Sequence, residues 1–152
     1  MNRVGLISDT HGLLRAEAVQ ALSGVELIIH AGDIGGSEVI EALRALAPVY
    51  AVRGNNDRGP WASSLPLRLD LEVGGVRVHV LHDLKELGGN VDQGRFDVVV
   101  SGHSHKPGVV KKDGALLVNP GSAGPRRFKL PVTVGSLIIG DGPVRAEIFN
   151  LL

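Results

Sequence analysis

Seven side chains that can bind metal ions follow five short apolar runs in this sequence. Asp9 and His11 follow the first run, and His103 and His105 follow the last. The three intervening runs are each followed by a single candidate: Asp33, Asn55 and His82. Ligands at the carboxyl ends of several strands can converge on one edge of a sheet, even when they are far apart in sequence. Seven oxygen and nitrogen donors are enough for two metal ions, which indicates metal-assisted hydrolysis.

The donor types restrict the choice of metal. Imidazole together with carboxylate suits Mn, Fe, Zn or Ni better than Mg or Ca, which prefer oxygen alone. The two carboxylate oxygens of Asp33 could bridge two ions, and the amide oxygen of Asn55 could hold an ion without quenching its charge. Each short motif by itself is equally typical of a polar turn. Only the joint pattern favours a metal centre.

In the first half of the chain, predicted strands alternate with predicted helices, and the strands would position these ligands. Apolar runs predict strands at residues 3–8, 27–31 and 49–53. Leu14, Ala18 and Leu22 recur at helical spacing, and Ser37 is expected to be the N-cap of a helix at 38–46. A strand–helix–strand order of this kind predicts parallel strands with right-handed crossovers.

The second half has the alternation typical of hairpins. Turns at Gly74-Gly75, Asp113-Gly114 and Asp141-Gly142 are expected to join strand pairs at 67–73 and 76–80, 109–112 and 116–118, and 133–139 and 144–150. A single strand is predicted at 97–101, and a short helix between residues 85 and 94. A parallel first half and an antiparallel second half predict two packed sheets with helices outside them.

The length of the chain predicts one soluble domain over residues 1–152. Because 43% of the residues are hydrophobic but only 3% are aromatic, the core is expected to be aliphatic. Sixteen basic and sixteen acidic residues cancel, which disfavours extended nucleic acid and anionic membranes as partners but permits a small phosphorylated substrate. The sequence has no cysteine and no long apolar run, so a cytoplasmic protein is expected.

The five blocks occur in an order that resembles the calcineurin-like metallophosphoesterases along nearly the whole chain. They read Asp9-Thr10-His11, Gly32-Asp33, Gly54-Asn55-Asn56-Asp57, His82 and Gly102-His103-Ser104-His105. The later segment Asn119-Pro120-Gly121-Ser122 is similar to the small bacterial and archaeal branch, the phosphodiesterases similar to YfcE. Agreement of both order and strand context is far more specific than any one motif.

The resemblance implies an α/β sandwich of four layers, αββα, in which helices flank two mixed β-sheets. It also implies two divalent ions, with Mn expected first and Fe, Ni or Zn next. One ion would be held by Asp9, His11, Asp33 and His105, and the other by Asp33, Asn55, His82 and His103. With Asp33 as the bridge, a metal-bridging hydroxide would attack phosphorus in line.

Two positions depart from the pattern of many relatives. Asn56 stands where larger members carry a histidine that protonates the leaving group, and an amide cannot act as a general acid. Asn56 is therefore expected to hydrogen-bond a phosphoryl oxygen, and Asp57 to orient a ligand histidine. Asp83 replaces a common glycine; it could accept a bond from His82, act as a substitute acid or serve as a turn residue, and the acid role is the least favoured.

The remaining polar and aromatic candidates have ordinary interpretations. His30 is expected to be structural or to support a ligand, and His79 to face the polar side of its hairpin without a chemical role. Arg126 and Arg127 could bind phosphate or be solvated. Trp61 could be a substrate wall, a subunit contact or a loop anchor.

Phosphodiester hydrolysis is the favoured function, because of the branch resemblance and the absent general acid. A phosphomonoesterase is the alternative within the same chemistry. A metal-binding scaffold resembling the retromer subunit of this fold is the alternative from another class, and a nuclease would need a basic track that zero net charge does not favour. Relatives often pair, so a homodimer is a further expectation.

Overall fold

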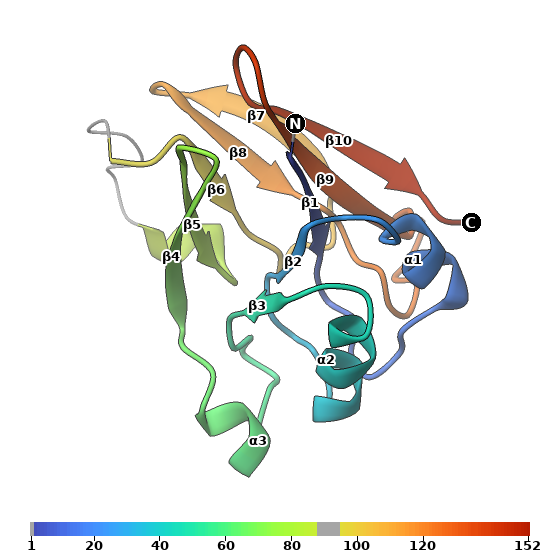
Figure 1. Cartoon of the computed structure of the whole chain (residues 1–152). Coiled ribbons are helices and arrows are strands. Elements are labelled where there is room, and N and C mark those ends of the chain that lie inside the picture. The colour runs from blue at the N-terminus through green and yellow to red at the C-terminus, as the bar shows by residue number, and fades with distance from the viewer. Residues whose placement is uncertain (1, 88–94) are drawn as a thin grey trace.

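The chain forms two five-stranded sheets in the computed structural model, which describes residues 2–87 and 95–152 (Figure 1). The first sheet has the order β10-β9-β1-β2-β3, with strands at Arg145–Asn150, Thr133–Ile139, Asn2–Ile7, Leu27–His30 and Val49–Ala51. The second has the order β4-β5-β6-β8-β7, with strands at Arg68–Val73, Val76–Leu81, Val98–Val100, Ala115–Asn119 and Gly108–Lys112.

Both sheets are mixed, which confirms the predicted fold class. In the first sheet, β1, β2 and β3 are parallel and the hairpin β9–β10 joins β1 in antiparallel fashion. In the second sheet, β5, β6 and β8 are parallel, and β4 and β7 are antiparallel edges. The predicted parallel first half and the three hairpins of the second half are confirmed, but the second half is not wholly antiparallel, because β5, β6 and β8 run parallel. Alternation indicates that a hairpin forms, but it does not say which sheet edge the hairpin joins.

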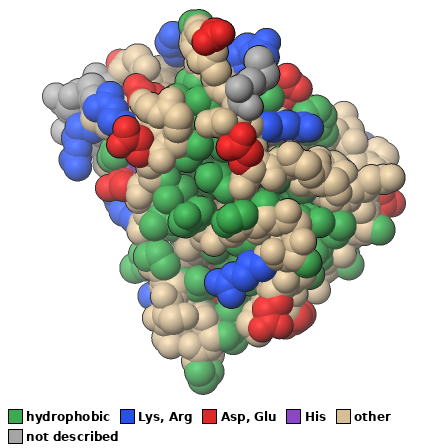
Figure 2. Space-filling model, in the orientation of Figure 1, with side chains coloured by type: hydrophobic (Ala, Val, Ile, Leu, Met, Phe, Trp, Pro, Cys, Tyr) green, Lys and Arg blue, Asp and Glu red, His purple; other side chains and the backbone are tan. Residues whose placement is uncertain are grey.

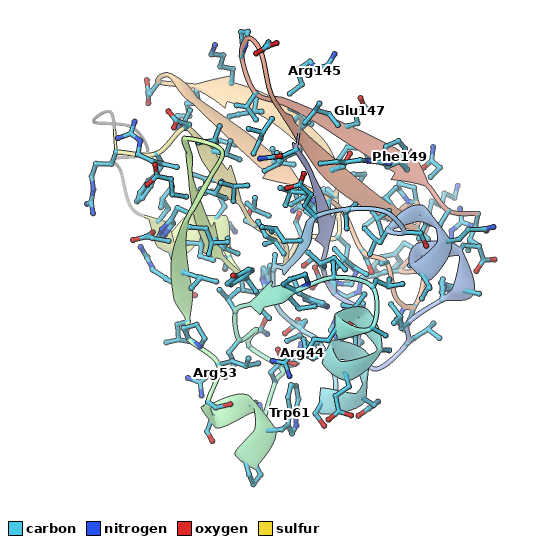
Figure 3. The ribbon with its side chains drawn as sticks, viewed as in Figure 1. Arg44, Arg53, Trp61, Arg145, Glu147 and Phe149 are labelled. Atoms are coloured by element: carbon cyan, nitrogen blue, oxygen red, sulfur yellow. The ribbon has the colours of Figure 1, made fainter. Side chains whose placement is uncertain are left out.

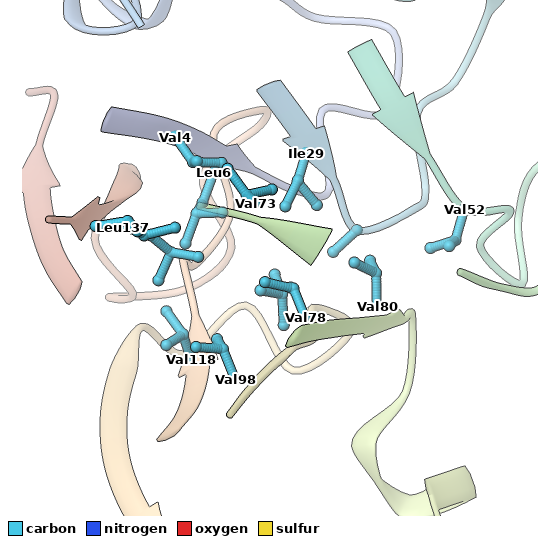
Figure 4. Close-up of a cluster of buried hydrophobic side chains, with 13 residues drawn as sticks. Val4, Leu6, Ile29, Val52, Val73, Val78, Val80, Val98, Val118 and Leu137 are labelled. Carbon is cyan, nitrogen blue, oxygen red and sulfur yellow. The ribbon is translucent and has the colours of Figure 1, made fainter. Parts of the chain in front are cut away.

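The core lies between the two sheets. Leu6, Ile29 and Leu137 of the first sheet face Val78 and Val98 of the second, and each is at most 1% exposed (Figure 4). Successive side chains along a strand point to opposite faces of the sheet, so each strand contributes every second residue to this layer. The core is aliphatic, as the composition predicts.

The outer layers differ in thickness. The helices α1 (Ala16–Ala21) and α2 (Ser37–Arg44) cover the first sheet, where Ala18, Leu22 and Leu43 are buried (Figure 1). On the second sheet, the described part of the outer layer contains one 3₁₀ turn, η1 (Leu84–Leu87), whose leucines pack near Val99. The four layers agree with the predicted αββα arrangement. The predicted helix between 85 and 94 overlaps η1, and the rest of that range lies outside the described residues.

Two local details differ from expectation. Ser37 is the first residue of α2 rather than its N-cap; Gly36 occupies the cap position, and no side chain caps this end. A short helix that was not predicted, α3 (Pro60–Ser63), follows β3 and begins with proline, which suits a first helical turn. Trp61 packs from α3 against the core under α2, so it acts as a loop anchor (Figure 3).

The surface shows no dominant charge on the face in Figure 2. Acidic and basic side chains are interspersed there around a central group of hydrophobic side chains, and no basic track crosses the described residues of that face. Within residues 2–87 and 95–152, no helix has the length and hydropathy needed to span a membrane.

Candidate metal centre

The loops that follow β1, β2, β3, β5 and β6 meet at one edge of the two sheets. Asp33, after β2, lies at the middle of this meeting point. Its Oδ2 atom is 3.6 Å from His11 Nε2 and 3.3 Å from His82 Nε2. One carboxylate therefore touches histidines from both sheets, as expected of a bridging ligand.

One candidate ligand group consists of Asp9, His11 and His105, whose donor atoms all lie within 4.8 Å of one another. Asp9 Oδ1 is 3.8 Å from His11 Nε2 and 3.5 Å from His105 Nε2. The other oxygen, Oδ2, accepts hydrogen bonds from the Ser8 hydroxyl at 2.7 Å and the His103 backbone N–H at 3.1 Å. These bonds fix the carboxylate so that Oδ1 faces the two histidines.

This group fits a divalent cation. Asp9 Oδ1 and His11 Nε2 are buried and have no hydrogen-bond partner among the described residues. Leaving a buried polar atom unpaired costs about 1–3 kcal/mol, and a cation between them would remove that cost. Two imidazole nitrogens with a carboxylate oxygen are donors that suit a transition metal.

The second candidate group consists of Asp33, His82 and His103, also within 4.8 Å of one another. His82 Nδ1 lies 2.7 Å from the Ala31 carbonyl, so it carries the proton and directs Nε2 toward Asp33. His103 Nδ1 is 3.3 Å from both His82 Nε2 and Asn55 Oδ1. All seven predicted ligand residues thus lie together at one edge.

The electrostatics of the second group favour a charged Asp33. Burial alone would raise the pKa of Asp33, but the contact with His82 and two hydrogen bonds from Asn56 outweigh it and hold the pKa well below its usual range. Burial alone would lower the pKa of His82, but Asp33 and the Ala31 carbonyl reverse this and raise it. A cation must displace any proton on His82 Nε2, so metal affinity should fall in acid.

His105 belongs to a different electrostatic environment. Burial lowers its pKa, Asp9 opposes that shift, and the charge of Arg127 adds to it. A neutral imidazole at neutral pH is the form that binds a metal ion. The effect of Arg127 places this arginine near the first ligand group.

Asn56 and Asp57 support the ligands through contacts other than those predicted. Asn56 donates from its backbone N–H to Asp33 Oδ1 at 2.9 Å and from its side chain to Oδ2 at 3.0 Å. Asp57 was predicted to orient a histidine, which is wrong. Its oxygens accept backbone N–H bonds from Ile34, Gly35 and Gly54, at 2.9, 3.0 and 2.9 Å. Asp57 therefore ties the Asp33 loop to the Asn55 loop.

Five of the candidate ligands have left-handed backbone conformations. Their φ angles are 54° at Asp9, 45° at His11, 56° at Asp33, 71° at His103 and 62° at His105. Such conformations cost an L-residue about 1–2 kcal/mol each. Strain of this kind concentrates at functional sites, where the surrounding structure holds it in place. This pattern separates these residues from ordinary polar turns.

Two glycines of the motifs are required by close backbone approach. A Cβ atom on Gly54 would lie 2.1 Å from the Asp33 nitrogen, and one on Gly102 would lie 2.0 Å from Ser8 Oγ. No side chain fits at such distances. The glycines let the loops from different strands interlock.

The two other histidines lie outside the ligand groups. His30 is fully buried; its Nδ1 accepts from the Gly32 N–H at 3.1 Å and its Nε2 bonds Thr10 Oγ1 at 3.0 Å. Burial lowers the pKa of His30 to about 3, so it is a neutral structural residue, as expected. His79 was predicted to lie on a polar face. It is instead buried, because Phe96 stacks on it with ring centroids 4.5 Å apart and Asp70 contacts its Nδ1.

Asp83 has the predicted role of a turn residue, but its carboxylate faces a histidine other than His82, the partner that was also considered. Its Oδ1 accepts the Lys85 N–H at 3.1 Å, as in a side-chain-capped turn. Its Oδ2 lies 3.8 Å from His103 Nε2, so the histidine that it faces is His103 and not His82.

Two cavities flank His103. One has a volume of about 580 Å³ and reaches Asn55 and His82; the other, about 640 Å³, lies on the side of β7 and β8. The first also contains Arg53 and Arg68, which the sequence reasoning missed. Arg53 lies two residues after the end of β3, at the same end of the molecule as Trp61 (Figure 3). Its position one residue before the Gly54-Asn55 block was the signal that could have revealed it.

Comparison with known proteins agrees with this geometry. The profile of the calcineurin-like phosphoesterase superfamily domain matches residues 2–142. A probable metallophosphoesterase of Methanothermobacter thermautotrophicus is 37% identical over 150 residues, covering 91% of this chain and 87% of that protein. The structure of an archaeal phosphodiesterase has a TM-score of 0.80 at 25% identity, covering 97% and 99% of the two chains. The phosphoesterase YfcE of E. coli has a TM-score of 0.72 at 26% identity, covering 90% and 88%.

The fold is also shared with a Vps29 protein. Vps29 of Entamoeba histolytica, in complex with Zn²⁺, has a TM-score of 0.74 at 22% identity, and 99% of each chain is covered. At this identity the likeness concerns the fold alone.

Proposed function

Because the chain belongs to the calcineurin-like phosphoesterase superfamily, we propose that it is a metal-dependent hydrolase that cleaves phosphodiesters. The position of Asp33, in contact with one histidine from each of two ligand groups, carries this proposal. A bridging carboxylate between two cation sites is the arrangement that two-metal phosphoester hydrolysis requires.

The residues present would hold two divalent ions. Asp9, His11, Asp33 and His105 would hold one, and Asp33, Asn55, His82 and His103 the other. Mn²⁺ is the first candidate because of the mixed nitrogen and oxygen donors, with Fe, Ni and Zn next. When bound, the ions would polarise phosphoryl oxygens and activate water.

The chain's own residues favour a diester. Asn56 can donate one remaining amide hydrogen to a phosphoryl oxygen, but it cannot protonate a leaving group, so leaving groups of low pKa should react best. Two cavities, one on each side of His103, offer room for two ester arms. A monoester has one arm and would fill only one of them.

Metal analysis and hydrolysis of aryl esters test the proposal. The purified protein should carry about two transition-metal ions per chain and, with Mn²⁺, should cleave bis(p-nitrophenyl) phosphate faster than p-nitrophenyl phosphate. The variant His82→Ala should lose one ion and most of the activity. His79→Gln is the matched control, because it removes a buried histidine from outside the ligand groups.

The alternative functions predict other results. Retention of both ions without cleavage of either ester would favour the metal-binding scaffold. Faster cleavage of the monoester would favour a phosphomonoesterase. If His82→Ala leaves both metal content and rate unchanged, the ligand assignment is wrong.

A further inference from the structure

The cavity beside β7 and β8 differs in charge from its neighbour. Three of its lining side chains are cationic, those of Lys85, Lys106 and Arg127, while Asp83 is its one acidic lining residue among the described residues. We call it the basic cavity. It adjoins His103, so a ligand at the candidate metal centre can extend into it.

Among the described residues that line it, the other cavity has no excess of positive charge. Arg53 and Arg68 are accompanied by three acidic residues, Asp57, Asp83 and Glu86. Arg68 also donates a hydrogen bond to the backbone carbonyl of Glu86, which engages its guanidinium. The two cavities are therefore suited to different ester arms, one of them negatively charged.

The loop that carries Arg127 is fixed against the first ligand loop. The Ala123 N–H donates to the Ser8 carbonyl at 3.0 Å, and the Ser122 hydroxyl donates to the Asp9 carbonyl at 3.1 Å. The Arg15 guanidinium donates to the Gly124 carbonyl at 3.2 and 3.3 Å. These bonds fix the backbone a few residues before Arg127 against the loop that carries Asp9, and the exposed side chain of Arg127 extends from this anchored loop to line the cavity.

Aliphatic side chains form another part of the cavity wall. Val110 lines it with 58% of its surface exposed, and Leu84 and Leu117 add further aliphatic surface. A volume of about 640 Å³ is typical of a site for a small molecule. A ligand with an apolar body and a terminal anion would bury this surface and pair with the cations.

We infer that the basic cavity binds one ester arm of the phosphodiester substrate, and that this arm carries a second negative charge besides the scissile phosphate. Lys106 and Arg127 then determine specificity, because they line the cavity without belonging to either ligand group. The inference rests on the proposed function and adds the charge class of the substrate to it.

A matched pair of substrates tests the inference. Thymidine 5′-(p-nitrophenyl phosphate), with and without a 3′-phosphate, presents the same leaving group and the same scissile bond. The enzyme should prefer the 3′-phosphorylated ester about tenfold in kcat/KM, the effect of two charge pairs of the strength seen near protein surfaces. The double variant Lys106→Ala/Arg127→Ala should abolish that preference. Lys111→Ala/Lys112→Ala removes the same charge from β7 outside the cavity and should keep it.

Product binding gives a second readout that does not depend on turnover. Calorimetry should show that the Mn²⁺-loaded protein binds thymidine 3′,5′-bisphosphate more tightly than thymidine 5′-phosphate, and that only the Lys106/Arg127 variant loses the difference. Equal rates for both esters, or a preference that survives in that variant, would overturn the inference and leave the phosphodiesterase proposal intact. Failure to cleave any ester would instead refute the proposed function, and calorimetry would still decide whether the cavity selects the second anion.

Discussion

The space between the sheets and the edge where the strands end are built in opposite ways. Between the sheets, aliphatic side chains such as Leu6, Val98 and Leu137 are completely buried and lie on regular strands. At the edge, Asp9 and Asp33 are just as buried, yet both have left-handed backbones, and Asp9 leaves an oxygen without a hydrogen-bond partner among the described residues. The interior supplies the free energy that holds the strained edge in place.

The largest expected effect is the loss of activity on substitution of Asp33 at the sheet edge. Asp33→Asn removes the charge that both ligand groups share, while asparagine tolerates the left-handed backbone and keeps an acceptor for the Asn56 N–H. Activity should fall roughly 10³-fold, since the metals are worth several kcal/mol in the transition state. Thermal unfolding without added metal should change little. A variant with normal turnover would show that Asp33 is not the shared ligand.

A substitution in the core should have the opposite effect, a loss of stability without a loss of activity. Leu137→Ala leaves a cavity in the middle of the core, so the free energy of unfolding should fall by about 2–5 kcal/mol. Urea denaturation measures this loss. Metal content and kcat per folded molecule should stay near those of the wild type; a parallel loss of both would mean that core and edge are not separable.

His30 lies at the boundary between the two regions and gives them a pH dependence. Its pKa is about 3 in the folded protein and near 6.5 when unfolded, so the unfolded chain binds an extra proton as the pH falls below 6.5. The stability that neutral His30 contributes is complete above that value and decreases by about 1.4 kcal/mol per pH unit toward pH 3. His30→Gln cannot titrate, so its unfolding free energy should depend less steeply on pH between 6.5 and 4. Identical slopes would exclude burial of a neutral His30.

The smallest effect is expected at the opposite end of the second sheet, where Asp97 precedes β6. Its carboxylate accepts the Arg77 backbone N–H at 2.9 Å, and bonds from the Arg77 backbone and side chain lower its pKa. The pair is partly exposed, so Asp97→Asn should cost at most about 1 kcal/mol in unfolding free energy and leave activity unchanged. The lowered pKa means that this contribution is present at neutral pH and lost as the pH falls below about 4, where wild type and variant should converge.

The candidate metal ligands could be predicted from the sequence, but the residues that hold their loops in place could not. Each ligand follows an apolar run, so the convergence of Asp9, Asp33 and His103 follows from strand ends alone. The contacts of Asp57 could not be predicted, because its partners are backbone N–H groups that become neighbours only after two loops meet. The interaction of Arg127 with the site likewise depends on a tether between distant segments.

The sequence analysis could not assign each strand to a sheet, for a related reason. The alternation in β9 and β10 specifies a hairpin with one buried face, and both sheets offer edges that such a hairpin could join. Its pairing with β1 is settled by long-range packing. His79 was misjudged in the same way, because the stacked ring of Phe96 comes from a residue far along the chain.

The position of β1 in the middle of the first sheet also determines when this sheet can be completed during synthesis of the chain. This first strand pairs on one side with β2 and on the other with β9, near the far end of the described sequence. A chain leaving the ribosome must keep one side of β1 open until β9 has been synthesised, and such distant pairing is slow to form. The segment with Asp9 and His11 directly follows β1, so nascent chains should acquire the ability to capture a cation abruptly, and only after β9 has been synthesised.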